Sequence, residues 1–439
     1  MFLKKIITNF DSHIQELLHG ASVAFVLKIA AAGFAFGLNV VLARLLGPAG
    51  SGMFFLAFTI VVIVAAIGRI GMENALVRFI ATNVTSGLPG KVLGVYKKAI
   101  FYSFIMATIL SVLLYLVSPW LSHVIFSKPN LAEPLTIMSI AVVPLALLTL
   151  HAHALQGLKK IAASVSVQSI VVPVITCLIA ILFVPKYGIN AAVWGYIVAT
   201  IMALLIGRRC WERASSNFNS HMVVFGNKEL FNSSIPLFSG VILNMVITWS
   251  PMLFLGVWEH NENVGIFSAA SRTSMLISFV LIAVNSIAAP KFAELYKQGN
   301  LKVLENVART SAKMMMLFAF PLLFVFLMIP EFILSMFGEQ FKQGAPILMV
   351  LAIGQFVNVS TGSVGYILMM TGNEILMRNN LLFIASLGVL LNVWLTSSYG
   401  VFGCAVAVAL TLSIQNLIAM ILVWKKLGIM TFPWINMMK

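Results

Sequence analysis

Charged side chains are scarce in this 439-residue sequence, where they make up 9% of the residues against 60% for hydrophobic ones. Soluble domains carry roughly a quarter charged residues, so a soluble fold is excluded. The chain has a single aspartate, Asp11, around which no carboxylate pair for a divalent metal ion can be built. It also lacks a phosphate-binding glycine loop, a His-Glu-x-x-His motif and a nucleophile elbow. The sequence therefore predicts neither an enzyme nor a metal or cofactor site.

Cysteine and export signals are equally sparse. The three cysteines, Cys177, Cys210 and Cys404, lie far apart, so neither a disulfide framework nor a metal cluster is expected. No small-residue cleavage site follows the first apolar stretch, which argues against a cleaved signal peptide. Instead, apolar residues at helical spacing predict an amphipathic interfacial helix over residues 1–20.

What the chain has in abundance is apolar runs of about 18 or more residues, each long enough to cross roughly 30 Å of hydrocarbon as a helix. They predict an all-α integral membrane protein with twelve transmembrane helices in two six-helix lobes. The first lobe covers residues 21–207 and the second residues 229–424. We expect a polar cytoplasmic linker at 208–228 and a cytoplasmic tail at 425–439.

The two halves share landmarks at a nearly constant offset. Gly52-Met53-Phe54 returns as Gly265-Ile266-Phe267, 213 residues later, and Tyr187-Gly188-Ile189 returns as Tyr399-Gly400-Val401, 212 residues later. Duplication of this length in a membrane protein is typical of transporters with two lobes. Because each half has an even number of spans, we expect the lobes to be related by an axis along the membrane normal.

The distribution of lysine and arginine predicts the orientation. With the N-terminus inside and spans alternating, nearly all of the 28 basic residues fall on the cytoplasmic side, and the exceptions on the outer side are Arg44, Lys128, Lys186 and Lys342. This asymmetry predicts cytoplasmic termini. It also explains the net charge of +15 by loops that face anionic lipid headgroups, without nucleic acid as a partner.

Two cations, Lys28 and Arg272, fall inside predicted spans. Each either reaches back to the headgroups or lies in a water-filled cavity between helices. Asn39 follows Lys28 by 11 residues, which puts both on one helical face and favours the cavity. No acidic residue occurs at a comparable depth, so the pair indicates an anion-binding site.

Several other polar residues in the spans have two interpretations. Arg69 and Glu73, four residues apart, form either an exposed helix ion pair or part of a site. His151 and His153 point to different sides of a helix and cannot bind one metal ion. They are either polar residues at a helix interface or, for one of them, a proton-coupling group.

Polar stripes occur on spans seven and ten. Asn244 lies on span seven, and Gln355 and Asn358 lie on span ten. Such stripes either hold helices together or line an aqueous path, and both interpretations stay open. Gly33 and Gly37 form a small-residue motif that allows a close helix contact in span one.

Segments at the turns resemble a known family. Residues 42–54 (LARLLGPAGSGMF) look like the first-hairpin signature of polysaccharide repeat-unit flippases, the Wzx-type branch of the MATE-like transporter superfamily. Further segments fit the same pattern in order: GMENALVRFIA, VGIFSAASR, APKFAELY, GEQF and MMTG. The resemblance implies two lobes that meet in a V around a central cavity, which opens to one side of the membrane at a time.

The resemblance also implies a substrate, undecaprenyl-diphosphate-linked oligosaccharide, moved from the inner to the outer leaflet of the bacterial cytoplasmic membrane. Related flippases hold the diphosphate with basic residues of spans one, two and eight, the spans that here contain Lys28, Arg69 and Arg272. Membrane lipids and polysaccharide polymerase or assembly proteins are the implied partners. Two alternatives remain: a MATE-type multidrug exporter, which would carry an intramembrane acid in its first lobe, and a membrane glycosyl polymerase or ligase, which would carry a large outer loop.

Overall fold

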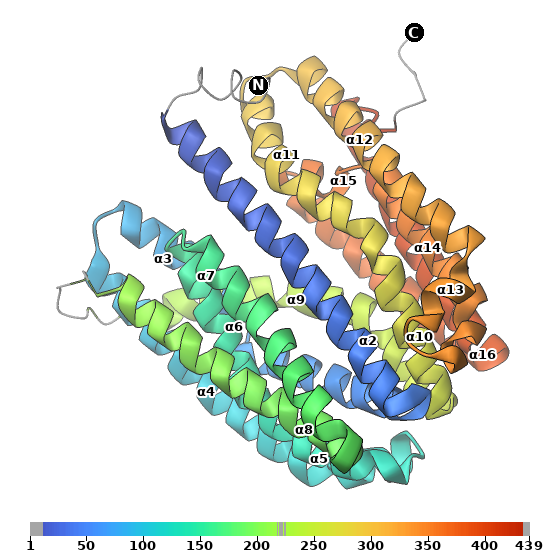
Figure 1. Cartoon of the computed structure of the whole chain (residues 1–439). Helices are drawn as coiled ribbons and strands as arrows, with labels where there is room; N and C mark the ends of the chain where they lie inside the picture. Colours follow the sequence, from blue (N-terminus) through green and yellow to red (C-terminus); the bar gives the residue numbers. More distant parts are fainter. Residues whose placement is uncertain (1–11, 217, 219–222, 224, 433–439) are drawn as a thin grey trace.

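A computed structural model describes residues 12–216, 218, 223 and 225–432, and these residues form helices and no strand (Figure 1). The helices in chain order are α2 (Ser12–Arg69), α3 (Met72–Thr85), α4 (Pro89–Trp120), α5 (Ala132–Met138), α6 (Val142–Gly157), α7 (Ile161–Val165), α8 (Val172–Ala214), α9 (Asn227–Trp258), α10 (Asn261–Ser274), α11 (Phe279–Lys297), α12 (Leu301–Met328), α13 (Pro330–Ser335), α14 (Ala345–Ser360), α15 (Val364–Met370) and α16 (Glu374–Leu427). Short 3-10 and π segments join several of them, among them η4 (Ser166–Val171), η5 (Met275–Ser278) and η6 (Glu339–Gly344).

Nine helical segments of the described chain are long and apolar enough to cross a membrane. Three of these contain a glycine with non-helical backbone angles: Gly47 in α2, Gly188 in α8 and Gly400 in α16. Gly188 (φ 60°, ψ −145°) and Gly400 (φ 59°, ψ −140°) adopt nearly the same left-handed conformation, which a side chain would disfavour. Because the chain reverses at each glycine, the three segments cross twice, in agreement with twelve predicted crossings.

The two lobes form a V (Figure 1), and the distribution of buried apolar residues explains this shape. One large core contains residues of both halves, such as Leu56 and Ile266. Two smaller cores are separate, one in the first half around Trp211 and one in the second half around Phe292. The lobes therefore share a core at one end, where α2, α10 and α13 lie close together, and diverge toward the end with the termini (Figure 1). We call these the closed end and the open end.

The repeated glycines of the sequence meet at the closed end. A Cβ atom added to Gly52 would lie 1.9 Å from the carbonyl oxygen of Asn261, and one added to Gly265 would lie 2.1 Å from the carbonyl oxygen of Pro48. The offset of 213 relates Gly52 to Gly265 and also Pro48 to Asn261, so the two contacts are symmetric. Glycine is required at both positions because backbone packs directly on backbone.

Helix α9 connects the two lobes. Near its start, Leu230 lies in the core of the first lobe, and the Ser234 carbonyl oxygen approaches Gly71 so closely that a Cβ there would be 2.5 Å away. Near its other end, the Pro251 carbonyl oxygen accepts a 3.8 Å hydrogen bond from the Cys404 thiol of α16. Although the sequence places α9 in the second lobe, its two ends thus pack on different lobes.

Predictions for the N-terminal segment, the linker and the small-residue motif of span one can also be compared with the structure. The interfacial helix expected over 1–20 lies partly outside the described residues, and from Ser12 the backbone is helical and continuous with the first span. The first part of the expected linker, up to Ala214, is helical. The close helix contact that Gly33 and Gly37 would allow is not formed, because a Cβ at either residue would meet nothing within 4 Å.

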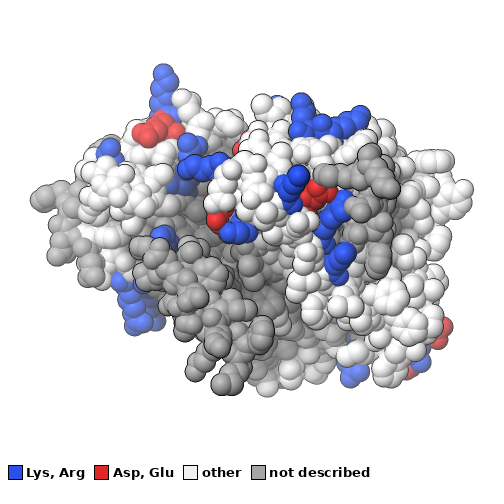
Figure 2. Space-filling view, turned by 90° about the horizontal axis from the view of Figure 1, so that it is seen from above, with Lys and Arg blue, Asp and Glu red and all other residues white. Residues whose placement is uncertain are grey.

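The outer surface carries large apolar side chains. Leu182, Leu317 and Trp394 are each more than 60% exposed on the described chain. Such a surface suits hydrocarbon rather than water, so these residues face lipid in a multi-pass membrane protein. On the face seen from the side of the termini, Lys and Arg side chains clearly outnumber acidic ones (Figure 2).

Candidate functional site

A cavity of about 710 Å³ lies between the lobes. Its walls come from α2, α6, η4 and α8 on one side and from α10 and α11 on the other. Lys28, Asn39, Arg69 and Arg272 all line it, and no aspartate or glutamate of the described chain does. We call it the central cavity. The structure thus brings together four residues that the sequence singled out in three different spans.

Arg272 holds the most exceptional position in the central cavity. Its guanidinium carbon lies 4.3 Å from the ring centre of Phe55 and 5.7 Å from that of Phe58. Within the described chain it forms no ion pair and no hydrogen bond with another side chain. Cation–π contacts of this kind contribute about 0.5–2 kcal/mol and leave the N–H groups free. An unpaired cation at this depth is costly, so Arg272 is available for an anionic ligand.

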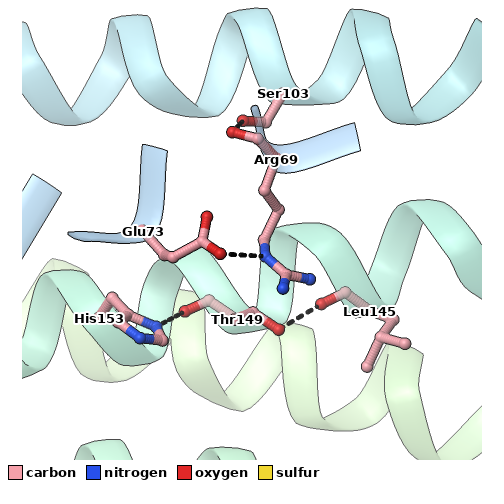
Figure 3. Close-up of polar contacts among 6 residues, drawn as sticks. All are labelled: Arg69, Glu73, Ser103, Leu145, Thr149 and His153. Carbon is pink, nitrogen blue, oxygen red and sulfur yellow. Dashed lines mark hydrogen bonds and ion pairs between the residues drawn. The ribbon is translucent and has the colours of Figure 1, made fainter. Parts of the chain in front are cut away.

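Arg69 forms an ion pair with Glu73, with 3.4 Å between Nε and Oε1 (Figure 3). The two side chains are only 12% and 6% exposed. The interpretation as a solvent-exposed helix pair is therefore wrong. Arg69 is anchored further because its carbonyl oxygen accepts a hydrogen bond from Ser103, and its side chain reaches toward α6, where Thr149 also lines the central cavity (Figure 3). Glu73 thus orients one cavity cation without lining the cavity.

The two histidines lie beside the central cavity without lining it. His151 donates from Nδ1 to the Leu147 carbonyl oxygen at 2.7 Å, and its Nε2 accepts from the Tyr96 hydroxyl at 2.8 Å. Both ring nitrogens of a neutral imidazole are thereby used. His153 donates from Nδ1 to the Thr149 carbonyl oxygen at 2.8 Å (Figure 3). A coupling role for either residue remains a prediction from the sequence.

A second cavity of about 230 Å³ lies on the other side of Arg272, which lines both spaces. Gln355 lines it, whereas Asn244 and Asn358 line neither cavity. Asn244 is exposed and donates to the Gly240 carbonyl oxygen at 2.9 Å. Sequence reasoning missed several other residues of the second cavity that carry polar groups, among them Thr59, Trp249 and Ser271. The repeat offers a signal for one of them, because Thr59 corresponds to Arg272 at the offset of 213.

Two cations join the lobes at the closed end. Arg44 donates from Nε to the Met336 carbonyl oxygen at 2.6 Å. Lys128, between two spans, donates to the Gly256 carbonyl oxygen. Burial lowers the pKa of Lys128 from 10.5 to about 8, and Glu259 partly opposes this shift. These bonds add to the glycine contact that keeps this end shut.

Lys128 should make the closed end sensitive to alkaline pH. Opening would hydrate the amine and return its pKa toward 10.5, whereas it is about 8 when the end is closed. Between pH of about 8 and 10.5 the open state binds more protons than the closed state. Each unit of rising pH in this range should therefore increase the ratio of closed to open protein by up to about tenfold. Below this window both states are protonated and no dependence is expected. Pulsed electron paramagnetic resonance would measure the ratio of closed to open protein, with one spin label at position 186 in α8 and the other at position 339 in η6. The same pH dependence in Lys128→Met would contradict the role of Lys128.

The pattern of the polysaccharide biosynthesis protein family matches residues 17–296, and that of the MatE family matches residues 236–394. A curated relative is the probable low-salt glycan biosynthesis flippase Agl15 of Haloferax volcanii, 22% identical over 224 residues. That match covers 51% of this chain and 48% of the relative, so the chain spans about half the length of the curated relative it matches.

Two solved structures are similar in fold. The lipid II flippase MurJ in an inward closed conformation has a TM-score of 0.75 at 14% identity, over 91% of this chain and 86% of that one. An inward-facing multidrug resistance MATE family transporter of the MOP superfamily has a TM-score of 0.74 at 13% identity, over 92% of this chain and 98% of that one. These likenesses show the MATE-like fold of two lobes.

Proposed function

The chain belongs to the polysaccharide biosynthesis protein family, and from this we propose that it is a flippase. It moves undecaprenyl-diphosphate-linked oligosaccharide from the inner to the outer leaflet of the bacterial cytoplasmic membrane. The observation that carries the proposal is the set of three cations, Lys28, Arg69 and Arg272, on a cavity that no described acidic side chain lines. A diphosphate gains strong attraction from cations in such a low-dielectric space.

Movement of the lobes would expose the central cavity to each side of the membrane in turn. The charge asymmetry supports the open end as the cytoplasmic one, and we propose on this ground that the central cavity opens to the cytoplasm in this arrangement of the lobes. The lipid headgroup enters from the inner leaflet and reaches Lys28, Arg69 and Arg272 in the central cavity, while its polyprenyl tail stays among lipid. Release on the other side requires the contact of Gly52 with Asn261 to separate, together with the Arg44 and Lys128 bonds.

A multidrug exporter of the same fold is the second candidate, favoured by the MatE match and the MATE neighbour. An exporter of cationic drugs needs a buried carboxylate in its cavity. In the described first lobe, Glu73 is the buried acidic residue. It forms an ion pair with Arg69 and does not itself line the central cavity. The charge of the cavity therefore supports an anionic cargo.

Deletion of the gene tests the proposal in cells. The lipid-linked repeat should accumulate in the inner leaflet, and surface polysaccharide should be lost, because no headgroup crosses. Restored polysaccharide on expression of the wild-type chain is the control. Normal polysaccharide in the deletion strain, with no accumulated lipid-linked repeat, would contradict the proposal.

Lys28→Ala should weaken binding of undecaprenyl diphosphate about three- to tenfold, a moderate effect because Lys28 is exposed and its attraction is partly screened. Lys28→Glu should weaken it more, since it adds repulsion. Binding to the purified protein in nanodiscs is the measurement. The matched control is Lys313→Ala, which removes an exposed lysine of α12 that lines neither cavity. Equal effects of the Lys28 and Lys313 replacements would contradict a role for Lys28 in the cavity.

A further inference from the structure

The second cavity is a separate space between the second lobe and α2, and its mainly apolar walls carry several polar groups. Its walls come from α2, α9, α10, α14 and α16, and Arg272 separates it from the central cavity. Hydroxyl and amide side chains are frequent on these walls, while Arg272 is the one charged residue of the described lining. The negative charge of the lipid headgroup explains the cations of the central cavity, but it does not explain the uncharged polar side chains of the second cavity.

Several polar groups on these walls have no partner within the described chain. Thr59 is 1% exposed, and its hydroxyl makes no hydrogen bond. Gln355 accepts a hydrogen bond from the Ser278 hydroxyl, which leaves its NH₂ group free. Ser271 and Trp249 are half-buried and also line this space, and neither the Ser271 hydroxyl nor the Trp249 indole N–H has a hydrogen-bond partner within the described chain. Buried polar groups are costly unless they are bonded, so this cavity is suited to a ligand with many hydroxyl groups.

The volume of the second cavity and its aromatic wall further limit which ligand it can bind. Its volume of about 230 Å³ lies below the roughly 300–1,000 Å³ of pockets for larger ligands, so it suits a single ring. Trp249 is held edge-on by Phe58, with 6.1 Å between ring centres. It offers an apolar face beside a polar N–H group, which matches a pyranose with one C–H face and a rim of hydroxyls.

We propose that the second cavity binds the sugar ring that is attached directly to the diphosphate. This inference rests on the proposed function, because it assumes that the diphosphate lies in the central cavity. Arg272 lines both spaces, so one guanidinium spans the junction between phosphate and sugar. Thr59 and Gln355 then bond the ring hydroxyls and make the flippase selective for lipids that carry a sugar.

The test compares two lipids on the purified protein in nanodiscs: undecaprenyl diphosphate and undecaprenyl-diphosphate-N-acetylglucosamine. The wild type should bind the sugar-bearing lipid more tightly. In the double variant Thr59→Val, Gln355→Leu, this preference should fall about tenfold, since two hydrogen bonds are lost, while binding of the bare diphosphate is unchanged. Ser271→Ala is a milder second variant. Thr176→Val is the control, because Thr176 is also buried and unpartnered but lines neither cavity.

The outcomes separate the two proposals. A preference that is unchanged in the double variant and in Ser271→Ala, while both lipids still bind, would overturn the sugar site and leave the flippase proposal standing. If neither lipid binds better than neutral undecaprenol, the proposed function fails and the sugar site fails with it. A preference that falls equally in Thr176→Val would also overturn the assignment, because the loss would then not depend on the cavity.

Discussion

Replacement of Arg272 by alanine should abolish transport and weaken binding of undecaprenyl diphosphate about ten- to hundredfold. The guanidinium lies 4.3 Å from the ring centre of Phe55 and 5.7 Å from that of Phe58, and it forms no described ion pair or hydrogen bond, so its donors are free for phosphate oxygens. Hydrogen bonds from a charged group contribute about 1.5–3 kcal/mol, which corresponds to that loss. Arg272→Lys should retain part of the binding, because it keeps the charge but loses the planar fork.

The same replacement should leave the fold as stable as before or more stable. A buried cation without a partner costs free energy, and alanine removes that cost. Thermal unfolding in detergent measures this effect separately from binding. Arg209→Ala, which removes an exposed arginine outside both cavities, is the control for binding. A large drop in the unfolding temperature of Arg272→Ala would show that Arg272 has a structural role, contrary to our account.

Alanine at Gly52 or Gly265 should force the closed end apart. The new methyl group would lie 1.9 Å from the Asn261 oxygen or 2.1 Å from the Pro48 oxygen, well inside contact distance. Overpacking of this kind costs about 1–3 kcal/mol, so the closed state should lose roughly ten- to hundredfold in population. Spin labels at positions 186 and 339 should then report longer distances, and transport should fall because the cavity no longer seals.

The chain provides its own control for this prediction. Gly33 and Gly37 also lie in α2, and a Cβ at either would meet nothing within 4 Å. Alanine there should leave the label distances unchanged and, by helix propensity, stabilise the helix by about 0.5–1 kcal/mol. Label distances that do not change in Gly52→Ala and Gly265→Ala would contradict a closed end held by this backbone contact.

Much of the fold could be predicted from the sequence because it depends on local patterns. Apolar runs set the crossings, and the repeated Tyr-Gly turns mark the bends at Gly188 and Gly400. Periodicity put Lys28 and Asn39 on one face of a helix, and both line the central cavity. Such features require only the 3.6-residue period, the length of a span and the conformational freedom of glycine.

Contacts between helices could not be predicted in the same way. Nothing local distinguishes Gly33, which faces open space, from Gly52, which touches another backbone. The burial of the Arg69 and Glu73 pair depends on α6 packing beside it, and the second cavity depends on five helices from both halves. The repeat pairs Thr59 with Arg272, but only the relative position of the lobes puts both on one cavity.

The central claim, movement of an anionic glycolipid through a basic cavity, is tested most directly in proteoliposomes. Fluorescent undecaprenyl-diphosphate-N-acetylglucosamine is placed in both leaflets, and the fraction that a membrane-impermeant quencher reaches is followed in time. Our account predicts that the wild type brings the inner pool to the outside, and that Arg272→Ala behaves like protein-free vesicles. Movement by the wild type no faster than in protein-free vesicles, or equal movement by Arg272→Ala, would contradict it.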